Sequence, residues 1–518
     1  ERVDSIFARF AGAATPGCAV GVSRGGTPIL ERAYGMADLE HGVAATPATI
    51  YEAGSVSKQF TAAAVVLLAL DGKLSLGDDV RQYIPELPDY GEPITIRQLI
   101  NHTSGLRDWG AVAQIHGWPR TTRVHTHDHV LDIAKRQKAL NYPPGQYYSY
   151  TNTGYNLLAI LVERVAGMPF AEFTKQRLFQ PLGLRDTQWR DDFARIVERR
   201  AIAYSPARDG TFRMDMPFEN VHGNGGLLTT VGDLLRWTEN LETGTLGGPA
   251  FLEEMHRRAV LDDGRTLTYA SGLVISEYRG VQEVAHSGST AGYRAYLARY
   301  PEQRLAVAVL CNAGNANATQ LARRVAEIYL GDVARSDAPP AGVRVPSPLL
   351  AALAGTYRNT RTHDPVRLVA EEGALRLEGA GALVPLSRTR FQYAGHSIVF
   401  DAPPRAGERT GFRRITPDGD TLRYEPVASF APMPDELAVY EGTYTSDEAE
   451  ATYTFETREG QLTMIDRYGR ARPLRPLYPD AFDAGAWMLR FHRDDAGAIT
   501  GLSAIAPRVW DLRFQKVK

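Results

Sequence analysis

Ser55-Val56-Ser57-Lys58-Gln59-Phe60-Thr61 runs directly into nine consecutive apolar residues, Ala62 to Leu70. An apolar run without a polar face predicts a helix that is buried on all sides, with Ser55 at its start. Residues three apart share a helix face, so Lys58 is expected one turn beyond Ser55, with its amine directed back toward the hydroxyl. A serine hydroxyl is a weak nucleophile at neutral pH and needs such a base within hydrogen-bond reach. The stretch therefore predicts a buried helix that carries a serine–lysine pair in its first turn.

Two further motifs follow the serine–lysine pair along the chain. Tyr150-Thr151-Asn152 comes after the turn-forming residues 143–149 and before a helix-like segment, Leu157 to Val165. A tyrosine on such a loop can face a cleft, where it could take or relay the serine proton. The third motif is His286-Ser287-Gly288. The backbone N–H of Ser55, one of the unpaired donors of a first helical turn, is expected to point where an oxyanion could form.

At these motifs the chain resembles the large family of penicillin-recognising serine enzymes. This family includes class C β-lactamases, D-Ala-D-Ala carboxypeptidases, D-aminopeptidases and β-lactamase-like carboxylesterases. The segments Leu99–Leu106 and Gly223–Thr230 are also similar to the family, and the resemblance extends from Gly17 to Leu330. Tyr-x-Asn in the middle motif favours the class C-like branch, since class A enzymes carry Ser-Asp-Asn there. The resemblance implies a serine hydrolase that works through an acyl-enzyme and needs neither a cofactor nor a metal.

The resemblance also implies a role for each residue of the first two motifs. Ser55 would be the nucleophile, Lys58 its activating base and Tyr150 the general acid/base. Asn152 would bind the substrate amide. From the residues alone, Ser55 could instead be only a helix N-cap, with Lys58 a solvated residue of the first turn. Tyr150 is one of four tyrosines between 147 and 155 and could serve only in packing.

The third motif would lie on the strand that lines the cleft, where β-lactamases carry Lys-Thr-Gly. His286 and Gly288 would face the site, and the backbone N–H of Ser289 would complete the oxyanion hole with that of Ser55. A Lys-Thr-Gly lysine is a fixed cation that holds the carboxylate of β-lactams and peptidoglycan stems. A histidine with its usual pKa of roughly 6.5 is mostly neutral at pH 7, so good β-lactamase activity is less expected. His286 could also be a hydrogen-bonded core histidine without a catalytic role.

Composition excludes several other classes of function. The chain has 518 residues, of which 44% are hydrophobic, so it is long enough for two to four domains. Its 58 basic and 60 acidic residues give a formal charge of −2, and no phosphate-binding glycine loop is present, so a nucleic-acid partner is not expected. The run at 62–70 is far shorter than the ~20 residues of a membrane-spanning helix. The expected partner is a small-molecule or short-peptide substrate, and the oligomeric state is left open.

The two cysteines bear on the redox environment. Cys18 and Cys311 each lie on a strand-like apolar run, at 17–22 and 305–311. Two cysteines are too few for a disulfide framework, so two buried thiols that pack as small hydrophobes are expected. The chain starts at Glu1 rather than Met, which is consistent with a removed leader. A periplasmic or secreted location is weakly favoured over a cytoplasmic one.

A histidine-rich segment, Val124-His125-Thr126-His127-Asp128-His129, allows a metal-site hypothesis. Spacing of i, i+2 and i+4 places side chains together on a strand face rather than a helix face. The segment leads directly into Val130–Lys135, which has a helical pattern. A polar loop and helix start near the rim of the cleft is therefore preferred to a metal site.

The strand signals lie at both ends of the region 1–335. Residues 17–23 and 29–35 predict one β-hairpin, and residues 293–300 and 305–311 predict another, followed by a helix at 318–330. A mostly helical stretch lies between the two hairpins. This order favours an α+β catalytic domain, residues 1–335, whose antiparallel sheet takes strands from both ends of the segment. The site is expected at the seam between the sheet and the helical half.

Two proline-rich linkers, 333–348 and 426–434, delimit two C-terminal segments that repeat each other. Gly355-Thr356-Tyr357 returns as Gly442-Thr443-Tyr444, an offset of 87 residues. Each copy alternates apolar and polar residues over short runs, which predicts a small antiparallel barrel. The expected domains are therefore a first lipocalin-like β-barrel at 336–430 and a second at 431–518.

Two barrels after a catalytic domain resemble the layout of D-aminopeptidases. In that relative a loop of the second barrel enters the active site and shapes a pocket for a free amine. The corresponding stretch here, 478–486, is short, although Asp480 or Asp483 could contact an ammonium group. The expected substrate is a D-amino-acid amide or short D-peptide. The alternatives are a small carboxylic ester, or a non-turnover penicillin-binding receptor or acyltransferase, and the barrels might equally bind a partner or cell wall.

Overall fold

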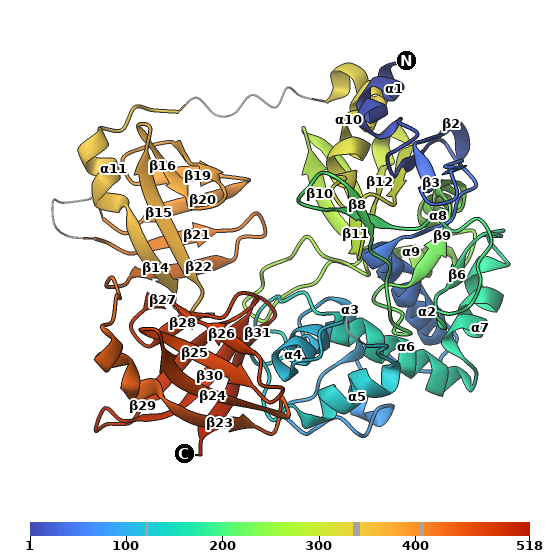
Figure 1. Cartoon of the computed structure of the whole chain (residues 1–518). Coiled ribbons are helices and arrows are strands. Elements are labelled where there is room, and N and C mark those ends of the chain that lie inside the picture. The colour runs from blue at the N-terminus through green and yellow to red at the C-terminus, as the bar shows by residue number, and fades with distance from the viewer. Residues whose placement is uncertain (121–122, 335–341, 403–408, 518) are drawn as a thin grey trace. The chain divides into compact units, whose positions relative to one another are not determined.

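The structure is a computed structural model that describes residues 1–120, 123–334, 342–402 and 409–517 (Figure 1). The described residues form two compact units. The first unit contains residues 1–109, 120–135 and the segment from 142 to the boundary at 337. The second unit contains the chain beyond this boundary together with two short segments, 110–119 and 136–141. Part of the first predicted linker lies outside the described residues.

The first unit is built around a six-stranded antiparallel sheet that takes strands from both ends of the segment, as the sequence predicts. Its strand order is β10-β11-β12-β13-β1-β2. The strands are β1 (Cys18–Arg24), β2 (Thr27–Tyr34), β10 (Val274–Tyr278), β11 (Val281–Thr290), β12 (Tyr293–Tyr300) and β13 (Leu305–Cys311). The pairing of β1 with β13 joins residues about 290 positions apart in the sequence, and it confirms the predicted α+β architecture.

Helices cover both faces of this sheet. On one face, α1 (Arg2–Phe7) and α10 (Ala318–Leu330) pack onto β12 and β13, where Val20, Val307 and Val325 are buried in a common core. On the other face, α8 (Val231–Thr243) packs onto β1 and β13. A Cβ added at Gly21 of β1 would lie 3.0 Å from Leu235 and 3.2 Å from Val231, both in α8. The glycine therefore lets α8 approach the sheet closely.

The segment between the two hairpins is largely helical. It contains α2 (Lys58–Leu70), α3 (Ile96–Ile100), α4 (Trp109–His116), α5 (His127–Arg136), α6 (Asn152–Ala166), α7 (Phe170–Thr174) and α9 (Gly248–His256). Helix α2 is buried from Lys58 to Leu68 and packs against α6 and α9, which confirms the predicted helix that is buried on all sides. Helix α6 begins at Asn152, five residues before the predicted start, because the Thr151 side chain caps it by accepting from Thr153 N. Among the described residues, no helix is both long and apolar enough to cross a membrane.

Short strands complete the first unit. A three-stranded sheet, in the order β5-β9-β6, lies beside the helical half. It is formed by β5 (Tyr51–Glu52), β6 (Gln188–Trp189) and β9 (Leu227–Thr229), while β3 (Met36–Asp38) pairs with β4 (Val43–Ala44) and β7 (Tyr204–Pro206) pairs with β8 (Phe212–Met214).

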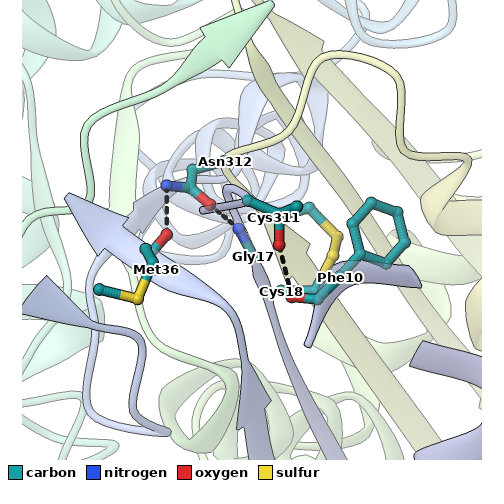
Figure 2. Close-up of a disulfide and its surroundings, with 7 residues drawn as sticks. Phe10, Gly17, Cys18, Met36, Cys311 and Asn312 are labelled. Atoms are coloured by element: carbon teal, nitrogen blue, oxygen red, sulfur yellow. Dashed lines mark hydrogen bonds between the residues drawn. A yellow bond between two sulfur atoms is a disulfide. The ribbon is translucent and has the colours of Figure 1, made fainter. Parts of the chain in front are cut away.

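Cys18 and Cys311 form a disulfide, so the expectation of two buried thiols is wrong. The antiparallel register places Cys18, the first residue of β1, opposite Cys311, the last residue of β13, with their Cα atoms 4.0 Å apart. Figure 2 shows the neighbouring Asn312 side chain between two backbone segments. Its Oδ1 accepts from Gly17 N at 2.7 Å, and its Nδ2 donates to Met36 O at 3.1 Å. A covalent bond and a buried amide therefore join the two ends of the catalytic unit.

The second unit contains two nine-stranded antiparallel sheets of the same topology. The first has the order β17-β16-β15-β14-β22-β21-β20-β19-β18, and the second repeats it as β26-β25-β24-β23-β31-β30-β29-β28-β27. The edge strands of each sheet are consecutive in the chain and are separated only by Leu383 in the first sheet and by Leu474 in the second. Each sheet therefore curls into a nearly closed barrel, which confirms the prediction of tandem barrels.

The strand bounds follow the 87-residue repeat. The first barrel contains β14 (Gly355–Asn359), β15 (Pro365–Glu371), β16 (Ala374–Leu377), β17 (Gly381–Ala382), β18 (Val384–Pro385), β19 (Arg390–Tyr393), β20 (His396–Phe400), β21 (Phe412–Ile415) and β22 (Thr421–Pro426), preceded by α11 (Ser347–Leu353). The second contains β23 (Gly442–Ser446), β24 (Ala451–Arg458), β25 (Gln461–Asp466), β26 (Ala471–Pro473), β27 (Arg475–Tyr478), β28 (Ala481–Asp483), β29 (Met488–Arg493), β30 (Ile499–Ala506) and β31 (Val509–Lys516).

The repeat extends to single hydrogen bonds in the barrel cores. Tyr357 in β14 donates its hydroxyl to Leu353 O at 2.9 Å. Tyr444, 87 residues later, donates to Tyr440 O at 3.0 Å. Both tyrosines are fully buried, so each barrel uses the same residue to tie its first strand to the helical turn before it.

The short stretch 478–486 forms the turn around β28. Asp480 pairs with Arg493 at 2.7 Å and also accepts from the hydroxyl of Tyr440 at 2.8 Å. Asp483 pairs with Arg475 at 2.9 Å. Both carboxylates considered as ammonium ligands therefore already have arginine partners within the second barrel.

Candidate active site

The candidate nucleophile lies on a tight turn held by a distant strand. Ser55 belongs to a 3₁₀ turn, Gly54–Ser57, that continues into α2, and Gly54 has a positive φ of 51° that favours glycine. The Ser57 hydroxyl donates to Gly54 O at 2.5 Å and accepts from Leu227 N at 3.1 Å. These bonds fix the turn against β9, so the half-buried Ser55 side chain is presented from a rigid backbone.

Lys58 is fully buried and directs its amine to three acceptors. Its Nζ lies 3.3 Å from Ser55 Oγ, 3.0 Å from Asn152 Oδ1 and 2.7 Å from the backbone oxygen of Asn224. As an ammonium, Lys58 donates to all three. As a neutral amine, it can donate to the two asparagine oxygens and still accept a proton from Ser55. The geometry therefore suits the predicted role of Lys58 as the base that activates the serine.

Two asparagines that contact Lys58 are themselves held in place. The backbone N–H of Asn152, the first residue of α6, donates to Asp108 Oδ2 at 2.8 Å. Asn156, one turn further along α6, donates its amide to Asn224 Oδ1 at 2.7 Å. The sequence motifs did not predict Asn224 because it acts through its backbone oxygen, although its glycine-rich segment is similar to the family. The amide oxygen of Asn152 already accepts from Lys58, and its predicted role toward substrate stays a prediction.

Tyr150 lies beside the lysine on the loop that precedes α6. The centre of its ring is 4.7 Å from Lys58 Nζ, a distance at which the π face attracts an ammonium. The ring also stacks at an angle on His102, with their centres 4.2 Å apart. Its place beside the serine–lysine pair is compatible with the predicted general acid/base role.

The third motif meets the nucleophile turn through backbone contacts. A Cβ added at Gly54 would lie 2.6 Å from Ser289 N, and one added at Gly288 would lie 2.0 Å from Ala53 O. Such distances are sterically forbidden, so glycine is required at both positions. The close approach places the backbone N–H of Ser289 next to the turn that carries Ser55, where the predicted oxyanion hole needs it.

His286 is buried in the wall of the site and is uncharged at neutral pH. Its ring lies 6.2 Å from that of Tyr150, and it shares a strand face with Gly288, two residues on. Burial and, to a smaller extent, the charge of Lys58 lower the pKa of His286 from 6.5 to about 4. The structure therefore agrees with the expectation that no fixed cation replaces the lysine of Lys-Thr-Gly.

Tyr269 also belongs to the site, although no motif predicted it. Its hydroxyl lies 3.1 Å from His286 Nε2, and its ring packs on those of His102 and Tyr150, with centres 4.7 and 6.2 Å away. Burial raises the pKa of Tyr269 well above 10, so the phenol stays protonated. A single tyrosine in a loop gives no signal in one sequence.

A chain of buried charges supports the nucleophile turn from below. Glu52, three residues before Ser55, accepts from Arg190 Nε at 2.8 Å and from the backbone N–H of Gly226 at 3.2 Å. Arg190 also lies 3.7 Å from Glu219, which pairs in turn with Arg120. Glu52 and Arg190 are 1% and 2% exposed. Sequence reasoning did not find this network because its members are separated by more than a hundred residues.

The histidines at 125–129 do not gather around a common point in the structure. Helix α5 begins at His127, whose Nε2 contacts the backbone oxygen of His222 at 3.0 Å, while His129 Nδ1 lies 3.1 Å from Thr126 N. This agrees with the preferred polar loop and helix start. Within the described ranges, one group of possible metal ligands is brought together, Asp38, Glu40 and His41 at the surface.

The structure thus brings all seven predicted site residues into one place in the first unit: Ser55, Lys58, Tyr150, Asn152, His286, Gly288 and Ser289. They supply a hydroxyl nucleophile, an amine and a phenol for proton transfer, and two backbone N–H groups for a developing oxyanion. This set of groups can carry out acyl transfer through a covalent serine ester.

Comparisons with known proteins agree with this reading of the geometry. A profile of the family described as Beta-lactamase matches residues 3–330. D-aminopeptidase from Brucella anthropi is 28% identical over 513 residues, which cover 94% of this chain and 93% of that protein. The octameric penicillin-binding protein homologue from Pyrococcus abyssi has a TM-score of 0.59 at 22% identity, over 91% of this chain and 99% of that chain. D-amino acid amidase from Ochrobactrum anthropi SV3, complexed with L-phenylalanine, has a TM-score of 0.55 at 22% identity, over 63% of this chain and 98% of that chain.

Proposed function

The chain belongs to the beta-lactamase family, and on this premise we propose that it is a serine hydrolase of D-amino-acid amides or short D-peptides. The observation that carries the proposed chemistry is the contact of 3.3 Å between the buried Lys58 amine and Ser55 Oγ. An amine held this close, with two further oxygens to orient it, is the base that a serine nucleophile needs.

Acylation follows from the arrangement. Ser55 Oγ attacks the substrate carbonyl carbon, and its proton passes to the Lys58–Tyr150 pair. The carbonyl oxygen gains negative charge where the N–H groups of Ser55 and Ser289 can donate. The C–N bond then breaks, and the same proton moves through this pair to the leaving nitrogen. The products of this half-reaction are a free amine and a Ser55 ester.

Deacylation repeats the same steps with water as the nucleophile. The Lys58–Tyr150 pair takes a proton from water as its oxygen attacks the ester carbon, and returns that proton to Ser55 Oγ as the C–O bond breaks. The carboxylic acid leaves, and the enzyme is regenerated. No redox step or co-reactant other than water is required.

The full length of the chain supports the substrate class. The similarity to D-aminopeptidases extends over 94% of the chain, and so includes both barrels as well as the catalytic unit. An uncharged His286 also fits a substrate whose leaving group is an amide or amine rather than a carboxylated ring. Carboxylesterase activity on small esters is the nearest alternative, since the same acyl-enzyme serves both reactions.

A rate panel tests this proposal. Purified protein is assayed with matched D- and L-aminoacyl anilides, nitrophenyl esters and a chromogenic β-lactam, beside the Ser55→Ala variant. We expect turnover of the D-anilides above the L-anilides, loss of all turnover in Ser55→Ala, and a mass adduct on Ser55 with a slow acylating agent. Turnover of the nitrophenyl esters alone would identify an esterase, and a stable adduct without turnover would identify a receptor.

We further propose that the protein works in an oxidising compartment, periplasmic or extracellular. The support is the disulfide between Cys18 and Cys311, because structural disulfides persist mainly outside the reducing cytosol. Thiol titration of the denatured protein, isolated from its native cells without reductant, tests this. We expect no free thiol, and two free thiols per chain would count against an oxidising location.

A further inference from the structure

Both ring nitrogens of His286 are already engaged in the structure. Nδ1 lies 2.6 Å from the backbone oxygen of Ser287. A carbonyl oxygen can only accept a hydrogen bond, so the proton of the neutral imidazole is on Nδ1. Nε2 then carries a lone pair, and the hydroxyl of Tyr269, 3.1 Å away, donates to it.

Tyr269 is well placed to hold this arrangement. It is buried, and its backbone is anchored by a bond from Ala259 N to its own oxygen at 2.9 Å. Its ring is packed between those of His102, 4.7 Å away, and Tyr148, 5.8 Å away. A side chain confined in this way keeps its hydroxyl directed at His286.

The pair forms an uncharged part of the wall of the acylation site. His286 lies on the same strand face as Gly288, which touches the turn that carries Ser55. A lysine at this position on the strand would offer a carboxylate a cation. Here the substrate meets an imidazole without charge, whose Nδ1 proton and Nε2 lone pair are both engaged.

We propose that Tyr269 is a positioning residue that fixes His286 in its uncharged, Nδ1-protonated form and thereby selects substrates without a carboxylate at this wall. This inference rests on the proposed function and defines its substrate class more closely. Amides and esters with uncharged leaving groups are accepted. Peptides that end in a free carboxylate are disfavoured, because desolvating that charge against a neutral wall is costly.

The first experiment reads the histidine directly and does not depend on turnover. The ¹⁵N NMR spectrum of His286 is recorded in the Ser55→Ala protein from pH 5 to 8 and assigned by its absence in His286→Gln. The groups that face the ring are Lys58 from α2, Tyr150 from the loop before α6, and Tyr269. We expect a neutral, Nδ1-protonated ring throughout. Titration near pH 6.5, or a proton on Nε2, overturns the proposal.

The second experiment measures selection with D-alanyl-D-alanine and its C-terminal amide, two ligands that differ only in the terminal carboxylate. We expect the wild type to favour the amide by about tenfold or more in kcat/KM. Tyr269→Phe should reduce this preference through KM for the free acid, with kcat on an activated ester nearly unchanged. Tyr148→Phe, which removes a neighbouring hydroxyl that does not contact the His286 ring nitrogens, is the matched control. An unchanged preference in Tyr269→Phe overturns the proposal, and if neither ligand is hydrolysed, the NMR spectrum still decides it while the proposed function fails.

Discussion

Removal of the Cys18–Cys311 disulfide should destabilise the catalytic unit without altering its chemistry. The bridge closes a loop over a sequence separation of 293 residues, which contains every predicted site residue. A loop of this length lowers the entropy of the unfolded chain by an amount equivalent to about 5.7 kcal/mol at 25 °C in the chain-entropy model. Natural and engineered bridges more often contribute about 2–4 kcal/mol, so we expect the double variant Cys18→Ala/Cys311→Ala to lose between about 2 and 6 kcal/mol.

The folded state should survive this change. Both cysteines are fully buried beside strand pairs that remain hydrogen-bonded in their absence. Asn312 still joins the same segments through Gly17 N and through the backbone oxygen of Ile202, each at 2.7 Å. We therefore expect kcat and KM of the double variant at 25 °C to match those of the wild type.

Urea unfolding followed by tryptophan fluorescence measures the effect, with and without reductant. The wild type should lose stability when reductant is added, and the double variant should not respond to it. Asn312→Ala is the matched control, because it removes local hydrogen bonds but leaves the bridge, so it should remain sensitive to reductant. A loss of less than about 1 kcal/mol in the double variant would refute the argument that the bridge restrains the unfolded chain.

Three further outcomes are expected. Tyr150→Phe should lower kcat on an anilide by about 10²–10⁴-fold with little change in KM, and near-normal kcat would assign Tyr150 to packing. Arg190→Met should cost about 3–5 kcal/mol in urea unfolding because Glu52 and Glu219 lose a buried partner, and Glu52→Gln in the same chain should recover part of it, whereas equal stability of the two variants would contradict this. Because the pKa of His286 is lowered from 6.5 to about 4, the unfolded chain takes up this proton first, so the free energy of unfolding should fall by up to about 3 kcal/mol between pH 6.5 and 4. His286→Gln should make this decline smaller, and an equal decline in both proteins would show that other groups cause it.

Local patterns explain why much of the fold could be predicted. The apolar run at 62–70 has no polar face, so burial of α2 follows from the sequence alone, and the spacing of Ser55 and Lys58 then places the amine near the hydroxyl. The 87-residue repeat made the second barrel predictable from the first. These features depend on residues that are close in the sequence or repeated along it.

The missed features depend on pairings between distant segments. Cys18 is the first residue of β1 and Cys311 the last of β13, so an antiparallel pairing of these two strands brings them together. The sequence indicated both strands but not that they are neighbours. Asn224 and Tyr269 were missed for the same reason, since a backbone oxygen and an isolated tyrosine acquire a role only when their segments meet α2 and β11.

The position of each catalytic group depends on contacts that span most of the first unit. Ala53 N donates to Leu227 O at 2.8 Å, and Lys58 Nζ donates to the oxygen of Asn224 at 2.7 Å, across more than 160 residues in each case. Ser289 N reaches the nucleophile turn from still further along the chain. No shorter piece of the first unit contains a complete set of these groups, whereas neither barrel contributes one of the seven predicted residues. Proton transfer and oxyanion binding therefore belong to the first unit alone, and any influence of the barrels on the reaction must act on which substrates reach Ser55 rather than on the acyl transfer itself.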